Sequence, residues 1–168
     1  MKLFKILITC CLLLPLTAIC QEEIKPEYAP GREKHRNKID ELGHKQGTWK
    51  TFNSLGQLIS EVEYVNDVKH GVSRKYYPYG KVMEEIEYQY GIKEGVYKKY
   101  YYSGQVKQEG EYMAGKKENK WTRYYDNGEI AVDGMYKHNR RDGNWKSYNR
   151  KGEVTSNNNF KDGVDSKS

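Results

Sequence analysis

The sequence predicts an all-β protein: an elongated, single-layer antiparallel sheet of five tandem 24-residue β-hairpin repeats, stacked like a solenoid. Three observations support this prediction: a glycine that recurs every 24 residues, 16 tyrosines against 3 Phe and 3 Trp, and a mean hydropathy of -1.01. With 36% hydrophobic and 31% charged residues, the chain is too polar to fill a thick core between two packed layers. Its 168 residues allow one domain or one short array. A conventional α/β enzyme is therefore not expected.

Residues 1–20 have the organisation of a secretory signal peptide. Two lysines, Lys2 and Lys5, precede an apolar run from Ile6 to Leu16, and small residues follow before a polar segment. The apolar run is shorter than the roughly 20 residues of a spanning helix, so a retained membrane anchor is the less favoured interpretation. We expect export to the periplasm, the outer envelope or the extracellular space.

Cys20 has two alternative fates. Cleavage after Cys20 leaves small residues at Ala18 and Cys20 before the cut, as signal peptidase requires, and this is the favoured interpretation. Alternatively, Cys20 becomes a lipidated N-terminus, although Ile19 is bulky where a lipobox has a small residue.

The signal segment contains all three cysteines, Cys10, Cys11 and Cys20. The exported product therefore has no pair of cysteines for a disulfide or a cysteine-based metal site. Removing Lys2 and Lys5 lowers the basic residues from 29 to 27 against 23 acidic ones, a net charge of +4. A mild, interspersed charge of this kind does not predict a nucleic-acid partner.

Residues 21–46 are expected to form a charged linker and a degenerate N-terminal cap. The segment contains Pro26 and Pro30, and Gly43 continues the repeat one period backwards. Five full units follow, at residues 47–70, 71–94, 95–118, 119–142 and 143–166.

Several columns keep the 24-residue step through all five units. The central glycines are Gly56, Gly80, Gly104, Gly128 and Gly152. Near the start of each unit stand Trp49, Ser73, Tyr97, Trp121 and Trp145. Aromatic columns follow at Phe52, Tyr76, Tyr100, Tyr124 and Tyr148, and at Tyr64, Tyr88, Tyr112, Tyr136 and Phe160. The closing turn carries Asp67, Gly91, Gly115, Asn139 and Gly163.

The residue pattern of each unit predicts a β-hairpin. Aromatic and β-branched residues flank a turn tripeptide such as Asp126 to Gly128, where glycine supplies a positive φ. In the second strand the alternation predicts Val82, Ile86 and Tyr88 on one face and Glu85 with Glu87 on the other. The fifth unit is polar at residues 156–159 and is expected to act as a C-terminal cap.

The unit G-x-W-x-x-Y-Y-x-x-G-x-(aliphatic)-x-x-(Glu)-x-x-x-Y-x-x-G, as in Gly95 to Gly115, resembles the MORN-repeat variant of the bacterial YwqK-type antitoxin-like family. The resemblance covers about 120 of the 168 residues. It implies a β-hairpin scaffold that binds proteins or lipids, with some relatives named as antitoxins. The signal peptide departs from the commonest members and argues against neutralisation of a cytoplasmic toxin.

No residue pattern predicts catalysis, a cofactor or a metal site. The pairs Glu61/Glu63, Glu85/Glu87 and Glu109/Glu111 recur in the first three units, whereas a catalytic pair is normally unique. Cross-strand ion pairs with facing bases explain them better. These bases are Lys50, Lys75, Lys98, Lys99, Arg123 and Lys146.

Two other patterns are also interpreted as non-functional. The run from Gly110 to Lys117 mimics the spacing of a phosphate loop, but Lys117 stands where Ser or Thr should bind Mg²⁺. The histidines share no repeat column and have no partner at metal-ligand spacing. They are His35, His44, His70 and His138.

The tyrosine strips Tyr76/Tyr77, Tyr100/Tyr101/Tyr102 and Tyr124/Tyr125 are the candidate binding feature. One tyrosine of each pair is expected in the aromatic layer of the sheet and the other at the surface, where tyrosine favours protein contacts. The predicted binding residues are Tyr77, Tyr101, Tyr102 and Tyr125. The alternative is that the tyrosines only hold a thin sheet together.

These patterns predict a non-catalytic exported scaffold for protein–protein interaction, with an antitoxin- or immunity-like role as one form of it. The alternative is a module that binds envelope glycan or a membrane surface through the same rings. A hydrolase that uses the Glu pairs is the least favoured hypothesis. The open sheet has two exposed edges, which makes edge-to-edge self-association a further expectation.

Overall fold

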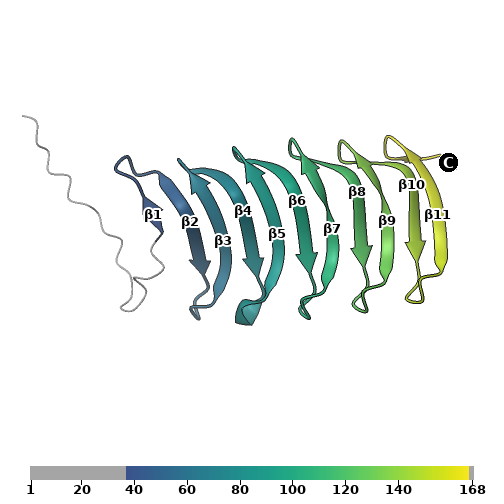
Figure 1. Ribbon diagram of the computed structural model, residues 1–168, viewed down its shortest axis with the longest axis horizontal. Helices are drawn as coiled ribbons and strands as arrows, with labels where there is room; N and C mark the ends of the chain where they lie inside the picture. Colours follow the sequence, from purple (N-terminus) through teal and green to yellow (C-terminus); the bar gives the residue numbers. More distant parts are fainter. Residues whose placement is uncertain (1–36, 167–168) are drawn as a thin grey trace, which may run out of the picture.

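The computed structural model describes residues 37–166, and these form one open sheet of twelve strands in sequence order (Figure 1). The strands are β1 (Lys38–Ile39), β2 (Lys45–Phe52), β3 (Leu58–Val65), β4 (Val68–Tyr76), β5 (Val82–Gln89), β6 (Ile92–Tyr100), β7 (Val106–Met113), β8 (Lys116–Tyr124), β9 (Ile130–Lys137), β10 (Arg140–Tyr148), β11 (Val154–Lys161) and β12 (Val164–Asp165). The predicted all-β hairpin array is therefore confirmed. The expected signal peptide at 1–20, with Cys20, lies outside the described residues, as does the linker up to residue 36.

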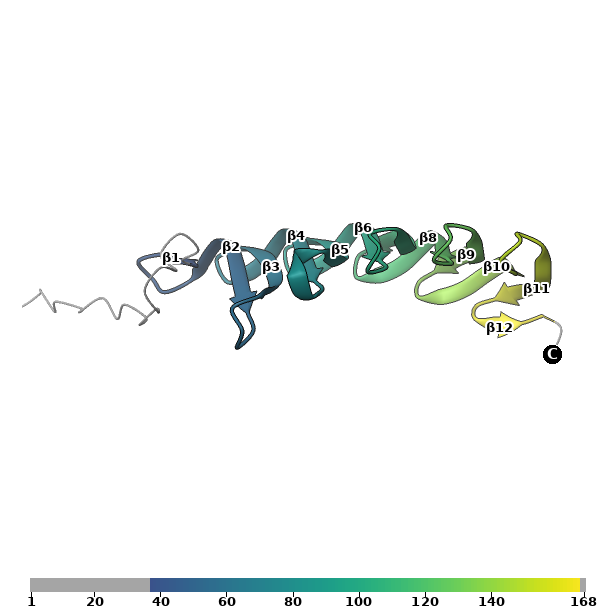
Figure 2. The same cartoon turned by 90° about the horizontal axis from the view of Figure 1, so that it is seen from below.

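The sheet is a single layer along its whole length. Figure 2 shows it edge-on as a narrow twisted strip, with no second layer packed against either face. Within residues 37–166 the only helical element is the 3₁₀ turn η2 (Pro78–Gly80). The buried hydrophobic side chains of this part are few, as the polar composition predicts. They are Ile86, Tyr97, Trp121, Ala131 and Trp145.

The 24-residue glycine column marks one of the two rows of turns. At Gly128 φ is 90°, its N–H donates to the Tyr125 carbonyl at 3.1 Å, and the Tyr125 N–H donates to the Glu129 carbonyl at 2.8 Å. A residue with a β-carbon rarely adopts this backbone conformation, which explains why glycine recurs here. The prediction of a glycine turn is confirmed.

The closing column marks the other row of turns. Each is a two-residue turn in which both residues have positive φ, such as Tyr90 at 49° and Gly91 at 80°. This is the type I′ geometry, whose twist matches that of the strands it joins. The turns are Asn66–Asp67, Tyr90–Gly91, Ala114–Gly115, His138–Asn139 and Asp162–Gly163.

The two faces of the sheet differ in chemistry. One, here called the aromatic face, carries the Trp/Ser/Tyr column that begins at Trp49 and the ring column that begins at Tyr64. The opposite ionic face carries the carboxylates Glu61, Glu85, Glu109 and Asp133. The core lies on the aromatic face, where Tyr97 stacks on Trp121 at 5.3 Å between ring centroids.

A β-bulge in each hairpin changes the expected alternation. The register shifts between Lys75 and Tyr76, so that Tyr76 pairs with Val82 while Lys75 pairs with Glu84. Directly paired residues point to the same face, and the Tyr76 hydroxyl reaches Glu61 on the ionic face. Val82 therefore lies on the ionic face, and its predicted place beside Ile86 is wrong. The extra residue inverts the order of side chains, which alternation alone does not reveal.

Short strands cover parts of both sheet edges. β1 has two residues and pairs with β2, and β12 has two residues and pairs with β11. Very short edge strands are one way in which sheets limit edge-to-edge pairing. The first hairpin begins at Lys45, two residues before the unit boundary that the sequence suggested.

Candidate interaction surface

The aromatic face is held together by rings that contact across the strands. Trp121 lies 5.3 Å from Tyr112 and 5.9 Å from Tyr136, both edge to face, and Tyr136 lies 5.0 Å from Trp145. Such edge-to-face pairs are favourable beyond the area they bury. The ring columns predicted from the repeat thus form one continuous layer from Tyr97 to Trp145.

A column of cations lies over these rings. Lys117 Nζ is 4.3 Å from the Trp121 ring centroid and 5.1 Å from that of Tyr136, and the Arg141 guanidinium lies 4.6 Å from Trp145. These are cation–π distances. The cation column consists of Lys45, Lys69, Lys93, Lys117 and Arg141. Sequence analysis missed it, although its 24-residue spacing was visible.

The cation column is not neutralised within the described part of the chain. Among residues 37–166, no carboxylate lies within ion-pair distance of any of its members. Burial lowers the pKa of Lys117, and the neighbouring charge of Lys93 lowers it further. The column therefore presents positive charge that no ion pair within residues 37–166 offsets.

A second row of charged residues crosses the same face. Its members pair directly across neighbouring strands: Glu84 pairs with Lys75 and Lys99, and Gln108 pairs with Lys99 and Arg123. Lys75 Nζ forms an ion pair with Glu84 at 2.9 Å. Beyond β5 the described row contains no further carboxylate, so the aromatic face becomes more positive from β6 to β10.

The ionic face shows the opposite arrangement, with bases and acids alternating across the strands. Lys50 contacts Glu61 at 2.8 Å, and Arg74 contacts Glu85 at 2.8 Å. Lys98 stands between Glu85 and Glu109 in the register. The predicted cross-strand ion pairing of the repeated glutamates is confirmed for Glu61 and Glu85.

Three of the facing bases named from the sequence lie on the other face. Lys75, Lys99 and Arg123 belong to the aromatic face, where Lys75 pairs with Glu84. The prediction that they face the repeated Glu pairs is therefore wrong. Adjacent residues of a strand point to opposite faces, so only one of Lys98 and Lys99 can face Glu109.

Each carboxylate of the ionic row also accepts a tyrosine hydroxyl from 15 residues along the chain. Tyr76 donates to Glu61 at 2.6 Å and Tyr100 donates to Glu85 at 2.7 Å. Burial and the bond to the carboxylate raise the pKa of Tyr76 and of Tyr100 to about 12. Burial would raise the pKa of Glu61, but hydrogen bonds from Lys50 and Tyr76 outweigh it and lower that pKa.

The other glutamate of each pair packs against the start of the next unit. The Glu63 carboxylate lies over Gly71, where an added β-carbon would be 2.1 Å from Glu63 Oε2. In the equivalent position Asn119 adopts a φ of 59° and donates from Nδ2 to Glu111 at 2.7 Å. These carboxylates thus have structural contacts in the repeat.

The four predicted binding tyrosines lie along the row of glycine turns. Tyr77, Tyr101 and Tyr125 are half-buried, and each donates its hydroxyl to a backbone carbonyl 23 residues later: those of Tyr100, Tyr124 and Tyr148, at 2.9, 2.7 and 2.8 Å. Tyr102 is 49% exposed and meets Tyr77 edge to face at 5.5 Å. No member of these strips lies in the aromatic layer, so that part of the prediction is wrong.

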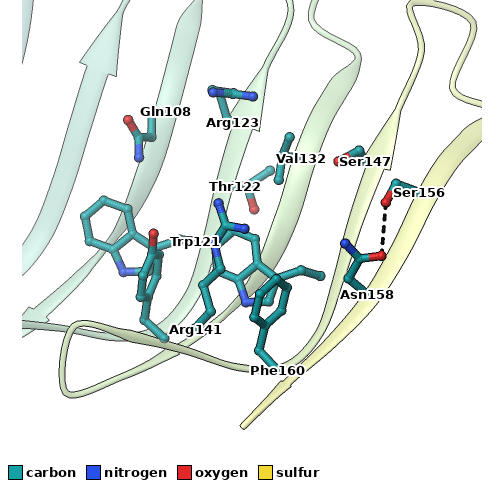
Figure 3. Close-up of a pocket in the computed structure, with 12 residues that line it drawn as sticks. Gln108, Trp121, Thr122, Arg123, Val132, Arg141, Ser147, Ser156, Asn158 and Phe160 are labelled. Atoms are coloured by element: carbon teal, nitrogen blue, oxygen red, sulfur yellow. Dashed lines mark hydrogen bonds between the residues drawn. The ribbon is translucent and has the colours of Figure 1, made fainter. Parts of the chain in front are cut away.

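A shallow hollow of about 250 Å³ opens on the aromatic face towards its C-terminal end (Figure 3). Trp121 and Arg123 come from β8, Arg141 from β10, and Ser156 with Asn158 from β11. Figure 3 shows Arg123 and Arg141 with Ser147, Ser156 and Asn158 to one side of them, and Ser156 donates to Asn158 at 3.3 Å. The hollow therefore combines two guanidinium groups with small polar side chains.

The described residues do not have the geometry of a phosphate-binding loop or of a metal site. Gly110 lies inside β7 beneath the Trp121 indole, and Gly115 is part of a type I′ turn. Within residues 37–166 no group of three His, Cys, Asp or Glu side chains could hold a metal ion. In the same range no helix is long and apolar enough to cross a membrane.

Comparison with known families identifies the repeat. The family model of the MORN repeat variant matches residues 45–66, 69–90, 93–113 and 117–138, together more than half of the chain. These segments coincide with the hairpins β2–β3, β4–β5, β6–β7 and β8–β9. A search of curated proteins finds no match. With its repeat geometry and this match, the chain belongs to the MORN repeat variant family.

Proposed function

We propose that this chain is an exported, non-catalytic scaffold that binds another protein along the aromatic face of its array. MORN repeats are commonly motifs for protein or membrane interaction and are in general not enzymes. The observation that carries the proposal is the cation column over the rings, which recurs in all five hairpins from β2–β3 to β10–β11 and has no carboxylate within ion-pair distance among residues 37–166. Repeated, unneutralised side chains along an extended surface suit a partner that contacts several units at once.

Two finer features belong to the proposal. Export is supported by the signal-like residues 1–20, and an immunity-like role by the resemblance to YwqK-type antitoxin-like proteins. In an exported protein, such a role would be directed at a toxin outside the cytoplasm. Among the predicted binding tyrosines, Tyr102 is the one whose exposed ring is available to a partner.

The test is affinity capture from envelope fractions of the native host, with the chain from Gln21 onward as bait and mass spectrometry as the readout. Recovery of one protein in stoichiometric amount supports the scaffold, and toxicity of that protein when produced alone supports the immunity-like form. Recovery of wall polymer or lipid without a protein contradicts the proposal and favours envelope binding instead.

A Tyr102→Ser variant tests the tyrosine prediction separately. Because Tyr102 is exposed, we expect its loss to leave the fold intact. Weaker capture by this variant supports a contribution from the turn row, and unchanged capture removes Tyr102 from the binding surface.

A further inference from the structure

We infer that the aromatic face between β6 and β10 is the docking site for an extended acidic segment of the partner protein. This inference rests on the proposed function, and it specifies the partner's chemistry and the conformation of the bound segment. The site consists of Lys93, Lys117 and Arg141 of the cation column and Arg123 of the second row.

Charge complementarity is the first argument. None of these four cations has a carboxylate within ion-pair distance among residues 37–166. On the ionic face of the same strands, Glu109 accepts the Tyr124 hydroxyl and Asp133 pairs with Lys120. Lys93 also lowers the pKa of Lys117, so the two ammonium groups repel each other in the free protein. A carboxylate placed between them would remove this repulsion.

Spacing is the second argument. Equivalent cations of consecutive units are separated by two strands, or about 9.6 Å at 4.8 Å per strand. A polyproline II segment advances about 9.3 Å in three residues and returns its side chains to the same side. Acidic residues at every third position of such a segment would therefore meet successive members of the cation column.

The hollow beside β10 is the third argument. Arg123 and Arg141 both line it, and the small polar side chains of Ser147 and Ser156 line it to one side of them (Figure 3). Guanidinium groups bind carboxylates through paired hydrogen bonds. The hollow can thus receive one acidic side chain of the segment.

The same face offers little to a sugar or a lipid. Trp121 is 2% exposed and Trp145 is 8% exposed, so their ring faces are not open for stacking on a glycan. Within β6 to β10 the exposed large apolar side chains lie on the other face, as Val96 does by pairing with Glu111. A membrane would therefore meet more apolar surface on the ionic face than on this one.

The test is fluorescence anisotropy with the purified chain and a labelled peptide of repeated Pro-Pro-Glu, which places one carboxylate per polyproline II turn. The comparison probes are Pro-Pro-Gln and Pro-Pro-Lys peptides of equal length, an anionic polysaccharide, and vesicles of anionic phospholipid. We expect binding of the Pro-Pro-Glu peptide that weakens with salt, and at least about tenfold weaker binding of every comparison probe.

Two charge-reversal variants locate the site. The groove variant K93E/K117E/R141E should weaken binding of the acidic peptide by at least about tenfold. The control variant K137E/K151E/K161E has the same net charge but changes exposed lysines at the ends of β9 and β11 and in a glycine turn, and it should bind like the wild type. If the groove variant fails to fold, the milder pair K93Q/R141Q carries the same expectation with a smaller loss.

Equal effects of the groove and control variants would overturn the inference, as would equal binding of Pro-Pro-Gln or preferential binding of vesicles or polysaccharide. Its failure is distinct from failure of the scaffold itself. If the envelope capture still yields a protein partner that binds the groove variant normally, the scaffold role of the array stands, and the placement of its binding site on the aromatic face is wrong.

Discussion

The indole of Trp121 lies directly against the α-carbon of Gly110, on the neighbouring strand. A β-carbon added at Gly110 would stand 2.2 Å from Cδ2 of Trp121. The same relationship links Gly134 and Trp145, at 2.3 Å. In the two preceding hairpin pairs, the position of Trp121 holds a smaller residue and the position of Gly110 holds a larger one. Val62 pairs there with Ser73, and Ile86 pairs with Tyr97. The sizes of the two positions are thus complementary from one hairpin to the next.

This complementarity predicts the outcome of exchanging residues between units. Gly110→Ile alone should lower the free energy of unfolding by about 3 kcal/mol, because the new side chain and the indole occupy the same space. The double variant G110I/W121Y copies the Ile86–Tyr97 pair and should recover stability to within about 1 kcal/mol of the wild type. Urea unfolding followed by far-UV circular dichroism measures both.

Trp121→Tyr alone is the matched control for this exchange. It removes ring area above Gly110 without adding any bulk, so we expect a loss of about 1–2 kcal/mol. If the two single changes simply added in the double variant, the packing relationship described above would be incorrect.

The hydroxyl of Tyr101 couples one unit to the next. It donates to the Tyr124 carbonyl at 2.7 Å, and Tyr101→Phe leaves that acceptor without its partner. We expect a loss of about 1 kcal/mol in the free energy of unfolding. Tyr102→Phe serves as the control, since Tyr102 is exposed and its hydroxyl bonds to no other described residue. Equal stability of the two variants in the same urea titration would argue against the coupling.

Alkaline pH should destabilise the fold through the tyrosines of the ionic face. Burial and hydrogen bonds to carboxylates raise the pKa of Tyr76, Tyr100 and Tyr124 from 10.0 to about 12. Between these values the folded state holds more protons than the unfolded state, so stability is complete below about pH 10 and falls as the pH rises towards 12. Urea unfolding at increasing pH, with tyrosinate absorbance recorded in parallel, tests this.

The variant Y76F/Y100F/Y124F is the control for the alkaline transition. It should start from a lower stability and lose less of it above pH 10, because three of the titrating hydroxyls are gone. A decline as steep as that of the wild type would show that other groups cause the alkaline effect.

Low pH should destabilise the fold through the carboxylates that accept these tyrosine hydroxyls. Burial opposes ionisation of Glu85, but hydrogen bonds from Tyr100 and Arg74 hold its pKa below 4.5, and Glu61 behaves likewise with Lys50 and Tyr76. Their stabilising contribution is present above pH 4.5 and disappears as the pH falls through the lower pKa values that these carboxyls have in the folded state. The E61Q/E85Q variant should therefore show a shallower loss of stability below pH 4.5, measured by urea unfolding, and an unchanged slope would contradict this assignment.

The repeat period determines the hairpins and turns of this structure, and it was sufficient to predict them. The glycine column predicts one row of turns, and the alternating second strands predict hairpins, because both are local properties of the backbone. The face of Val82 was not predictable in this way, since the extra residue of a bulge is visible only in the pairing register. Alternation in one strand could not show that Lys75 faces Glu84 and not Glu85.

The candidate surface was less accessible from the sequence. Tyrosine strips were the more conspicuous pattern, but Tyr76 and Tyr77 both have hydroxyl partners within the array. The cation column was equally periodic, and its meaning depended on knowing that Lys117 lies over Trp121 and lacks a carboxylate partner among residues 37–166. Contacts of this kind depend on side-chain direction as well as on spacing.

Quantitative capture of the native partner by three forms of the chain is the most direct test of the central claim, that the aromatic face binds another protein. The forms are the wild type, the groove variant K93E/K117E/R141E and the control variant K137E/K151E/K161E. We predict that the wild type and the control retain the same protein from envelope fractions and that the groove variant loses it. Equal recovery by all three forms, or recovery of no protein by any of them, would contradict the claim.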